Sequence, residues 1–100
     1  MRIVARRTLI AFGEKHPESK AALQHWINVA KAARWQSTQD VVGTFSKAKR
    51  LNRERVRFEI TGGGYRMIAA FDFGRQTAFI KFIGTHDEYD KIDAKTVSKF

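Results

Sequence analysis

Hydrophobic residues recur at helical spacing in the first half of the chain. The clearest pattern places apolar side chains three or four residues apart, at Leu23, Trp26, Ile27, Ala30 and Ala33. It predicts an amphipathic helix over residues 17–34. Pro17 suits the first turn of this helix because proline has a fixed φ and no N–H to leave unpaired. A weaker pattern of the same kind predicts an earlier helix over residues 5–15.

Two capping signals predict shorter helices. Ser37 and Asp40 form a capping pair ahead of an apolar stretch, which predicts a helix over residues 38–45. Thr85 and Glu88 have the spacing of a capping box, in which each side chain accepts a hydrogen bond from the other residue's backbone. A single helical turn is therefore expected directly after Thr85.

The second half of the chain changes to a period of two, which is the period of a β-strand. Alternation predicts strands over residues 55–60, 65–71 and 76–83. The glycine-rich residues 61–64 form the first turn between them. The second turn lies at residues 72–75, where Gly74 could adopt a positive φ. The middle strand is apolar on both faces, which favours a central position in the sheet.

These elements together predict a single α+β domain over residues 1–100. Its N-terminal helices should pack on one face of a small antiparallel β-sheet through Leu23 and Trp26, with the other face partly open. Residues 1–4 are short, apolar and β-branched, and could add an edge strand. A short C-terminal helix follows the sheet. Residues 94–100 are expected to fray, and the basic stretch that begins at Lys47 is expected to start as a loop.

Composition narrows the classes of function. The chain carries 19 Lys and Arg against 10 Asp and Glu, a formal net charge of +9. Such a surplus favours polyanionic partners, above all nucleic acid. The absence of Cys excludes disulfides and thiolate metal sites, and it fits a cytoplasmic location. No apolar run is long enough for a membrane span, so no membrane partner is expected.

The positive charge gathers in one run, for which we predict RNA contact. Its members are Lys47, Lys49, Arg50, Arg53, Arg55 and Arg57. Lys and Arg that neutralise phosphates release counterions, which makes such binding sensitive to salt. Arg55 and Arg57 lie on one face of a strand about 7 Å apart, close to the spacing of neighbouring phosphates. A solvated face, or a docking surface for an acidic protein, would explain the same run.

Candidate catalytic residues lie on the last two strands and the turn after them. Arg66 and Lys81 interrupt apolar strands, and could form a cationic floor for a phosphate or a salt bridge with Glu59 or Asp72. His86 and Tyr89 are three residues apart and share a face of the final helical turn. His86 could transfer protons near neutral pH, with Asp90 able to orient its ring.

The other histidines are interpreted as structural. His16 and His25 lie far from these residues in the sequence and have no matching partners. The three histidines are too scattered to form a metal site, so we expect neither a metal nor another cofactor. The glycines at residues 62–64 lack the lysine and the following helix of a phosphate-binding loop, and form a hairpin turn.

Several of these segments together resemble the HigB family of type II toxin–antitoxin systems. The resemblance spans residues 7–93. Its most specific parts are Tyr65-Arg66-Met67-Ile68 and Gly84-Thr85-His86-Asp87-Glu88-Tyr89-Asp90. Members of this family resemble RelE-type toxins in fold, with helices packed on a small, curved antiparallel sheet. The resemblance maps onto Arg66, Lys81, His86 and Tyr89 as candidate catalytic residues.

The resemblance implies an mRNA endonuclease that cuts messages on the ribosome and thereby inhibits translation. It implies metal-independent chemistry, in which a ribose 2′-OH attacks the adjacent phosphate. Arg66 and Lys81 would stabilise the developing charge, His86 would transfer protons, and Tyr89 would stack on a base or assist the transfer. A HigA-type antitoxin with a helix-turn-helix domain is the implied inhibitor, and DNA is implied only indirectly, through that antitoxin.

Two other classes of function remain open at this stage. A non-catalytic RNA- or DNA-binding module would explain the charge equally well, but it does not require His86 and Tyr89 near Lys81. A protein-interaction domain would dock an acidic partner and show no affinity for nucleic acid at physiological salt. Few aromatic residues are available for an open sheet face, which argues against a dedicated platform for stacking single-stranded bases.

Overall fold

The computed structural model describes residues 1–62 and 64–100. Residue 63, in the predicted glycine turn, lies outside the described residues. The elements in chain order are β1 (Arg2–Val4), α1 (Arg6–Lys15), the 3₁₀ turn η1 (Pro17–Ser19), α2 (Lys20–Ala32), α3 (Thr38–Thr44), β2 (Lys49–Arg50), β3 (Arg55–Ile60), β4 (Tyr65–Asp72), β5 (Thr77–Thr85) and α4 (His86–Asp90). The predicted α+β fold is confirmed, including the short C-terminal helix.

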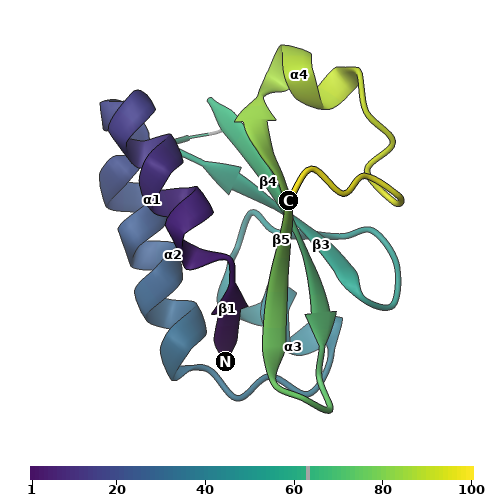
Figure 1. Ribbon diagram of the computed structural model, residues 1–100. Coiled ribbons are helices and arrows are strands. Elements are labelled where there is room, and N and C mark those ends of the chain that lie inside the picture. Colours follow the sequence, from purple (N-terminus) through teal and green to yellow (C-terminus); the bar gives the residue numbers. More distant parts are fainter. Residues whose placement is uncertain (63) are drawn as a thin grey trace.

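The strands form one mixed, curved sheet in the order β1-β5-β4-β3-β2 (Figure 1). The meander β3-β4-β5 is antiparallel and has β4 at its centre, as predicted. The predicted N-terminal edge strand is confirmed, although β1 pairs parallel to β5 in a sheet that was predicted to be antiparallel. One further detail differs from the prediction, because β2 forms within the stretch predicted as a loop, where Lys49 pairs with Arg57.

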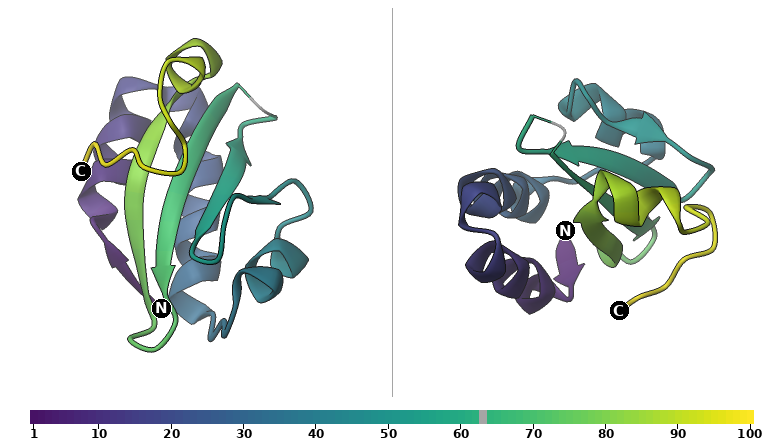
Figure 2. Two further views of the ribbon diagram at one scale, coloured as in Figure 1. Left: turned by 90° about the vertical axis from the view of Figure 1, so that its right-hand side faces the viewer. Right: turned by 90° about the horizontal axis from the view of Figure 1, so that it is seen from above.

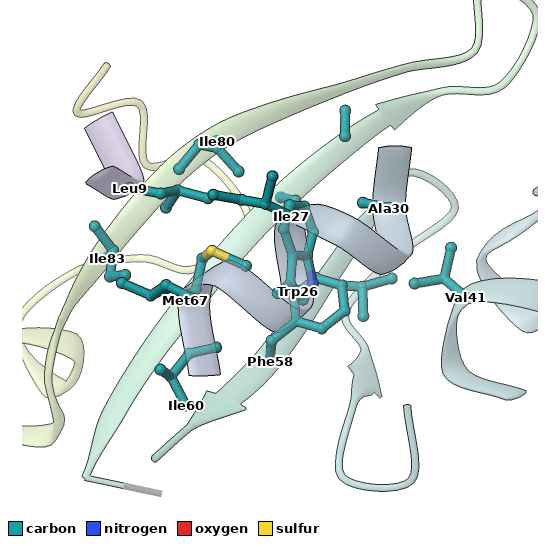
Figure 3. Packing of buried hydrophobic residues seen from close by; sticks show 14 of the residues in the cluster. Leu9, Trp26, Ile27, Ala30, Val41, Phe58, Ile60, Met67, Ile80 and Ile83 are labelled. Carbon is teal, nitrogen blue, oxygen red and sulfur yellow. The ribbon is translucent and has the colours of Figure 1, made fainter. Parts of the chain in front are cut away.

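The core lies between one face of the sheet and the pair α1–α2. Figure 1 shows these two helices side by side against the same face, and Figure 3 shows the side chains that fill the space between. Trp26 of α2 is 2% exposed and packs edge-on against Phe58 of β3, with ring centroids 5.3 Å apart. Leu9, Met67 and Ile80 continue the same cluster from α1, β4 and β5. Truncating a buried aromatic such as Trp26 to Ala costs roughly 3–5 kcal/mol in comparable cores.

The predicted helix over residues 17–34 is divided in the structure. A 3₁₀ turn precedes α2, and the buried hydroxyl of Ser19 donates to the His16 carbonyl at 2.7 Å. The prediction for the β4–β5 turn was wrong in one respect, because Gln76 rather than Gly74 has the positive φ, at 51°. The side-chain amide of Gln76 donates to the carbonyls of Trp35 and Phe73, and these tertiary contacts hold the turn.

A bulge in β5 displaces Lys81 from the regular ladder. Ile68 pairs with Phe82 while Ala69 pairs with Ile80, so that two residues of β5 span one step of β4. Lys81 is the extra residue. The bulge reverses the alternation of β5 beyond this point, because Ile80 and Ile83 both belong to the core cluster. Phe82 and Gly84 therefore face the opposite side of the sheet.

The C-terminal segment covers part of the sheet face opposite α1 and α2. The chain after α4 turns at Asp93 and crosses the sheet face remote from α1 and α2 (Figures 1 and 2). The Arg55 guanidinium donates to the carbonyls of Ala94 and Val97 at 3.1 and 2.8 Å. The Lys99 amide donates to the Lys81 carbonyl at 2.9 Å. The expectation that residues 94–100 fray was therefore wrong, because a buried arginine binds their carbonyls.

Replacing Arg55 should release this C-terminal segment. Arg55→Met keeps much of the apolar volume but removes two charge-assisted hydrogen bonds, so we expect a loss of about 1.5–3 kcal/mol in the free energy of unfolding. Amide exchange of residues 94–100 should accelerate as well. Chemical denaturation and hydrogen exchange measure the two effects. Arg53→Met is the matched control, because Arg53 is exposed and the substitution should leave both quantities unchanged.

Candidate active site

A single carboxylate gathers three basic side chains at one end of the sheet. Glu59 Oε1 lies 3.3 Å from Arg66 Nε and 3.5 Å from an Arg57 terminal nitrogen, and its Oε2 lies 3.7 Å from His86 Nε2. Strand pairing explains the first two contacts. Glu59 is directly opposite Arg66 in the β3–β4 ladder, and Arg57 is two residues earlier on the same face of β3. The Glu59 side chain is only 15% exposed, whereas His86 is 46% exposed.

Tyr89 lies under both arginines. The guanidinium carbons of Arg66 and Arg57 lie 4.9 and 5.7 Å from the centre of the Tyr89 ring. The same ring packs edge-on against Phe82, at a centroid distance of 6.1 Å. Cations placed over an aromatic face are attracted by its quadrupole, which fixes the two guanidinium planes beside Glu59.

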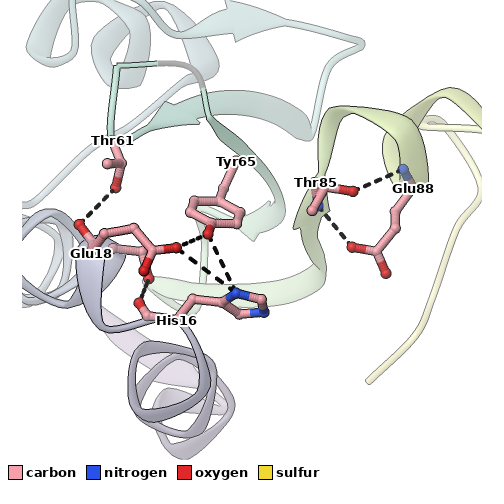
Figure 4. Close-up of polar contacts among 7 residues, drawn as sticks. His16, Glu18, Thr61, Tyr65, Thr85 and Glu88 are labelled. Atoms are coloured by element: carbon pink, nitrogen blue, oxygen red, sulfur yellow. Dashed lines mark hydrogen bonds and ion pairs between the residues drawn. The ribbon is translucent and has the colours of Figure 1, made fainter.

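Short-range interactions at the end of β5 place α4, which carries His86 and Tyr89. Thr85 and Glu88 form the predicted capping box, with Thr85 Oγ1 accepting from the Glu88 amide and Glu88 Oε1 accepting from the Thr85 amide (Figure 4). Gly84 is required at the preceding position. A Cβ there would lie 2.8 Å from the Phe82 ring and 2.9 Å from Glu88 Oε1, too close for any side chain.

Lys81 does not join this cluster. Arg66 pairs with Gly84, and Lys81 is three residues further along β5, about 10 Å away at the rise of an extended strand. Its amino group lies over the Phe79 ring, 5.5 Å from the centroid. The structure thus brings together Arg66, His86 and Tyr89 of the four candidate catalytic residues and places Lys81 apart. The carboxylate that contacts His86 belongs to Glu59, and no contact with Asp90 is found among the described residues.

The cluster keeps a surplus of positive charge. One carboxylate faces two guanidinium groups and a histidine that can also carry a proton. The Nε atoms of Arg57 and Arg66 are buried, and neither forms a hydrogen bond within the described part of the chain. Ion pairing and the Tyr89 ring hold these side chains. An anion such as a phosphate could therefore bind here without first breaking a network of directed hydrogen bonds.

The predicted RNA-binding run divides into four groups. Lys49 pairs with Arg57 across β2 and β3 and so shares its face, next to the cluster. Arg50 faces the other way and donates to Thr38 Oγ1 at 3.2 Å. Arg55 is 8% exposed and engaged with the C-terminal segment, so it is not available at the surface. The two remaining members of the run, Lys47 and Arg53, are exposed outside the strands.

His16 lies on the helix side of β4, among aromatic and acidic neighbours (Figure 4). Its ring is 4.3 Å from that of Phe12, and its Nδ1 is 3.3 Å from the Tyr65 hydroxyl, which donates to Glu18. The aromatic packing is consistent with the structural role interpreted from the sequence.

Glu59 is the residue that the sequence analysis considered only as a salt-bridge partner. The register of β3 and β4 could have predicted its partner Arg66. If Ile60 pairs with Tyr65 across the glycine turn, Glu59 must face Arg66. The contact between Glu59 and His86 could not be predicted from the sequence, because it depends on the bulge in β5. No group of three or more His, Asp or Glu side chains within residues 1–62 and 64–100 is arranged to hold a metal ion.

A comparison with protein-family models identifies the family of this chain. The family model described as HigB_toxin, a RelE-like toxic component of a toxin–antitoxin system, matches residues 19–92, or 74 of the 100 residues. The chain belongs to the HigB toxin family. Membership implies an antitoxin as a partner. A search of curated proteins found no match. None of the described helices is both long and apolar enough to span a membrane.

The capping box makes the position of α4 in this HigB-family chain sensitive to acid. The hydrogen bond from the Thr85 amide holds the pKa of Glu88 below its ordinary value of 4.5. A lowered pKa in the folded state means that the ionised carboxylate stabilises the fold. This contribution is present at neutral pH and is lost as the pH falls through the folded-state pKa. Glu88→Gln should therefore lower Tm modestly at neutral pH, and the difference from wild type should shrink as the pH falls below the ordinary carboxyl pKa of 4.5 and through the lowered pKa of the folded state.

Thermal unfolding followed by circular dichroism over a series of pH values measures this effect. Glu14→Gln is a suitable control, since Glu14 is an exposed residue of α1. A difference between Glu88→Gln and wild type that stays constant into the acid range would show that the charge on Glu88 does not support the cap.

Proposed function

We propose that this HigB-family toxin is an endoribonuclease that cleaves mRNA at the cluster formed by Arg57, Glu59, Arg66, His86 and Tyr89. The observation that supports this most strongly is the side-by-side placement of a carboxylate and an imidazole, Glu59 Oε2 and His86 Nε2, against two guanidinium groups. Such a set provides an acid, a base and anion stabilisation within one small volume, which is what cleavage of an RNA phosphodiester requires.

In the proposed reaction, Glu59 removes the proton from a ribose 2′-OH. The 2′-oxygen then bonds to the adjacent phosphorus, and the bond from phosphorus to the 5′-oxygen of the next nucleotide breaks. His86 supplies the proton that the leaving 5′-oxygen needs. The products are a 2′,3′-cyclic phosphate and a 5′-hydroxyl end, and no metal is needed for this balance. Arg66 and Arg57 stabilise the additional negative charge on the phosphorane.

Tyr89 has two functions in this proposal. Its ring supports both guanidinium groups, and because the residue is only partly buried it can also contact a base next to the cleaved bond. Lys81 has a different role from the one expected. Lys81 is three residues from Gly84 along β5, away from the residues proposed to act on the phosphate. We therefore assign Lys81 to contact with a flanking part of the RNA.

The RNA backbone would continue from Arg57 towards Lys49 at the sheet edge, with the exposed Lys47 and Arg53 beyond. The cluster consists mainly of charged side chains that suit a phosphate group, so we expect substrate positioning to come largely from elsewhere. The ribosome would supply it by holding mRNA in a defined geometry, an effect worth several kcal/mol of barrier. The proposed activity would act in the cytoplasm and inhibit translation. A HigA-type antitoxin carrying a helix-turn-helix domain would inhibit it.

Removal of the imidazole should abolish most of the cleavage. We expect His86→Ala to lower the single-turnover rate of cleavage of ribosome-bound mRNA by about 10²–10⁴-fold, the range typical of a lost general acid. His25→Ala, an exposed histidine on α2, should cleave at the wild-type rate. Lys81→Ala should show a much smaller loss than His86→Ala. Mapping of mRNA 5′ ends after induction provides the same comparison in cells.

The same experiment separates the competing functions. A protein that binds RNA with an affinity independent of His86 and generates no new 5′ ends would be a non-catalytic binding module. A protein without affinity for RNA at physiological salt would be a protein-interaction domain. Cleavage that is equally fast in His86→Ala would place the catalytic acid elsewhere.

Phosphate contact also predicts a specific dependence on salt. Each Lys or Arg that neutralises a phosphate of single-stranded RNA contributes about 0.7 to the slope of log K against log salt concentration. Arg57→Gln and Lys49→Gln should each reduce the slope by roughly this amount. Arg75→Gln, in the distant β4–β5 turn, should leave it unchanged. Fluorescence anisotropy with a labelled oligoribonucleotide measures the slope, and equal slopes for all four proteins would exclude the proposed path.

A further inference from the structure

The C-terminal segment, residues 93–100, returns across β5 and is bound there (Figure 2). The match to the family model ends at residue 92, so this segment lies outside the region on which family membership rests. The buried Arg55 binds two of its carbonyls, and the Lys99 amide donates to the Lys81 carbonyl at 2.9 Å. A segment held at several points can present its side chains in defined positions.

A hollow of about 350 Å³ lies between this segment, β5 and α4. Phe82, Ile83 and Ile92 give it an apolar wall, and Phe100 lines it from the C-terminal segment. Phe100 is 54% exposed, and it is one of only two large hydrophobic residues that are exposed in the described part of the chain. An exposed aromatic ring beside an apolar wall provides a surface on which a nucleobase can stack.

The lining of the hollow also carries positive charge. Lys91, directly after α4, and Lys99 of the C-terminal segment both line it, and both are exposed. Glu88 is the acidic residue of the lining, and its carboxylate already accepts a hydrogen bond from the Thr85 amide in the capping box. Two ammonium groups thus accompany one carboxylate that has a partner elsewhere, which leaves a surplus of positive charge for a phosphate.

The hollow is next to the catalytic cluster. Phe82 lines the hollow and also packs against the Tyr89 ring of the cluster, at a centroid distance of 6.1 Å. Helix α4 separates the two places, because His86 and Tyr89 contact the cluster while Glu88 lines the hollow. A helix with its side chains is about 10 Å across, so RNA bound at the cluster brings a neighbouring nucleotide to the hollow.

We propose that this hollow is a subsite for a nucleotide of the mRNA that flanks the cleaved bond. Lys91 and Lys99 bind the phosphate, and the base stacks on Phe100 against the apolar wall. The path described above leaves the cluster through Arg57 and Lys49 on the β2 side of the sheet, whereas this subsite lies on the β5 side and takes the other flank of the RNA. The subsite rests on the proposed function, because it extends the same RNA-binding surface.

RNA binding in the absence of cleavage tests the subsite. The probe is a fluorescently labelled oligoribonucleotide in which every 2′-OH is methylated, so that no 2′-oxygen can attack. Phe100→Ala should weaken its binding by roughly fivefold or more, because the stacking of one base is lost. Lys99→Gln should reduce the slope of log K against log salt concentration by about 0.7, the contribution of one phosphate contact.

Lys95→Gln is the matched control for Lys99→Gln. Lys95 is exposed on the same segment and does not line the hollow, so its replacement removes the same charge and should leave the slope unchanged. Wild-type affinity in Phe100→Ala, or a Lys99→Gln slope equal to that of Lys95→Gln, would overturn the proposal.

Release of the segment provides an independent test. Once hydrogen exchange shows that Arg55→Met has freed the C-terminal segment, adding Lys99→Gln to this variant should have no further effect on RNA binding, because the two changes act on the same subsite. An effect of Lys99→Gln that persists at full size in the released protein would show that Lys99 acts only through the net charge, and would also overturn the proposal.

Cleavage of ribosome-bound mRNA, measured separately, distinguishes the subsite from the proposed function. If the variants weaken RNA binding as stated but the wild-type toxin cleaves no RNA, the proposed function fails and the hollow remains an RNA-binding site. If the wild-type toxin cleaves and all variants bind RNA as it does, the subsite fails. If Lys99→Gln weakens antitoxin binding and leaves RNA binding unchanged, the hollow belongs to the antitoxin and the proposal is wrong.

Discussion

The pairing of Glu59 with Arg66 across β3 and β4 is the constraint on which the site depends. A carboxylate that is 15% exposed would be costly without partners, and the ladder supplies one directly opposite and another, Arg57, two residues away on the same strand. This ion-pair group is where we propose that an anion binds. Helix α4 places His86 and Tyr89 beside this group, where they can take part in the proposed reaction.

The packing of the rest of the molecule serves that arrangement. Helices α1 and α2 bury one face of the sheet, so the charged residues of β3 and β4 face the other way. The bulge at Lys81 changes the side to which β5 directs its residues, which puts Phe82 against Tyr89 and leaves Gly84 beneath α4. The capping box then orients the helical turn. The C-terminal segment covers the remaining apolar surface of that face through Arg55, beside the charged cluster.

Local sequence patterns predicted the helices and strands well. They predicted the contacts between residues far apart in the sequence poorly. The period of the apolar residues was enough to predict α2 around Trp26 and the three strands of the meander, and the capping-box spacing of Thr85 and Glu88 was enough to predict the cap of α4. RNA contact was wrongly predicted for Arg55. A strand pattern shows which face of the sheet a residue is on, but not that the C-terminal segment covers that face. Lys81 was grouped with Arg66 because counting from a turn assumes a regular ladder, which the bulge breaks. Glu59 was visible in the register but was considered only as a salt-bridge partner.

The most direct test of the account is to remove the charge of Glu59 and measure RNA binding and cleavage on the same protein. Glu59→Gln keeps the shape of the side chain but cannot accept a proton from a ribose 2′-OH. The account predicts that this variant binds RNA as tightly as wild type or more tightly, because a negative charge is gone. Its single-turnover cleavage should be slower by about 10²–10⁴-fold. A folded Glu59→Gln protein that cleaves at the wild-type rate would contradict the account.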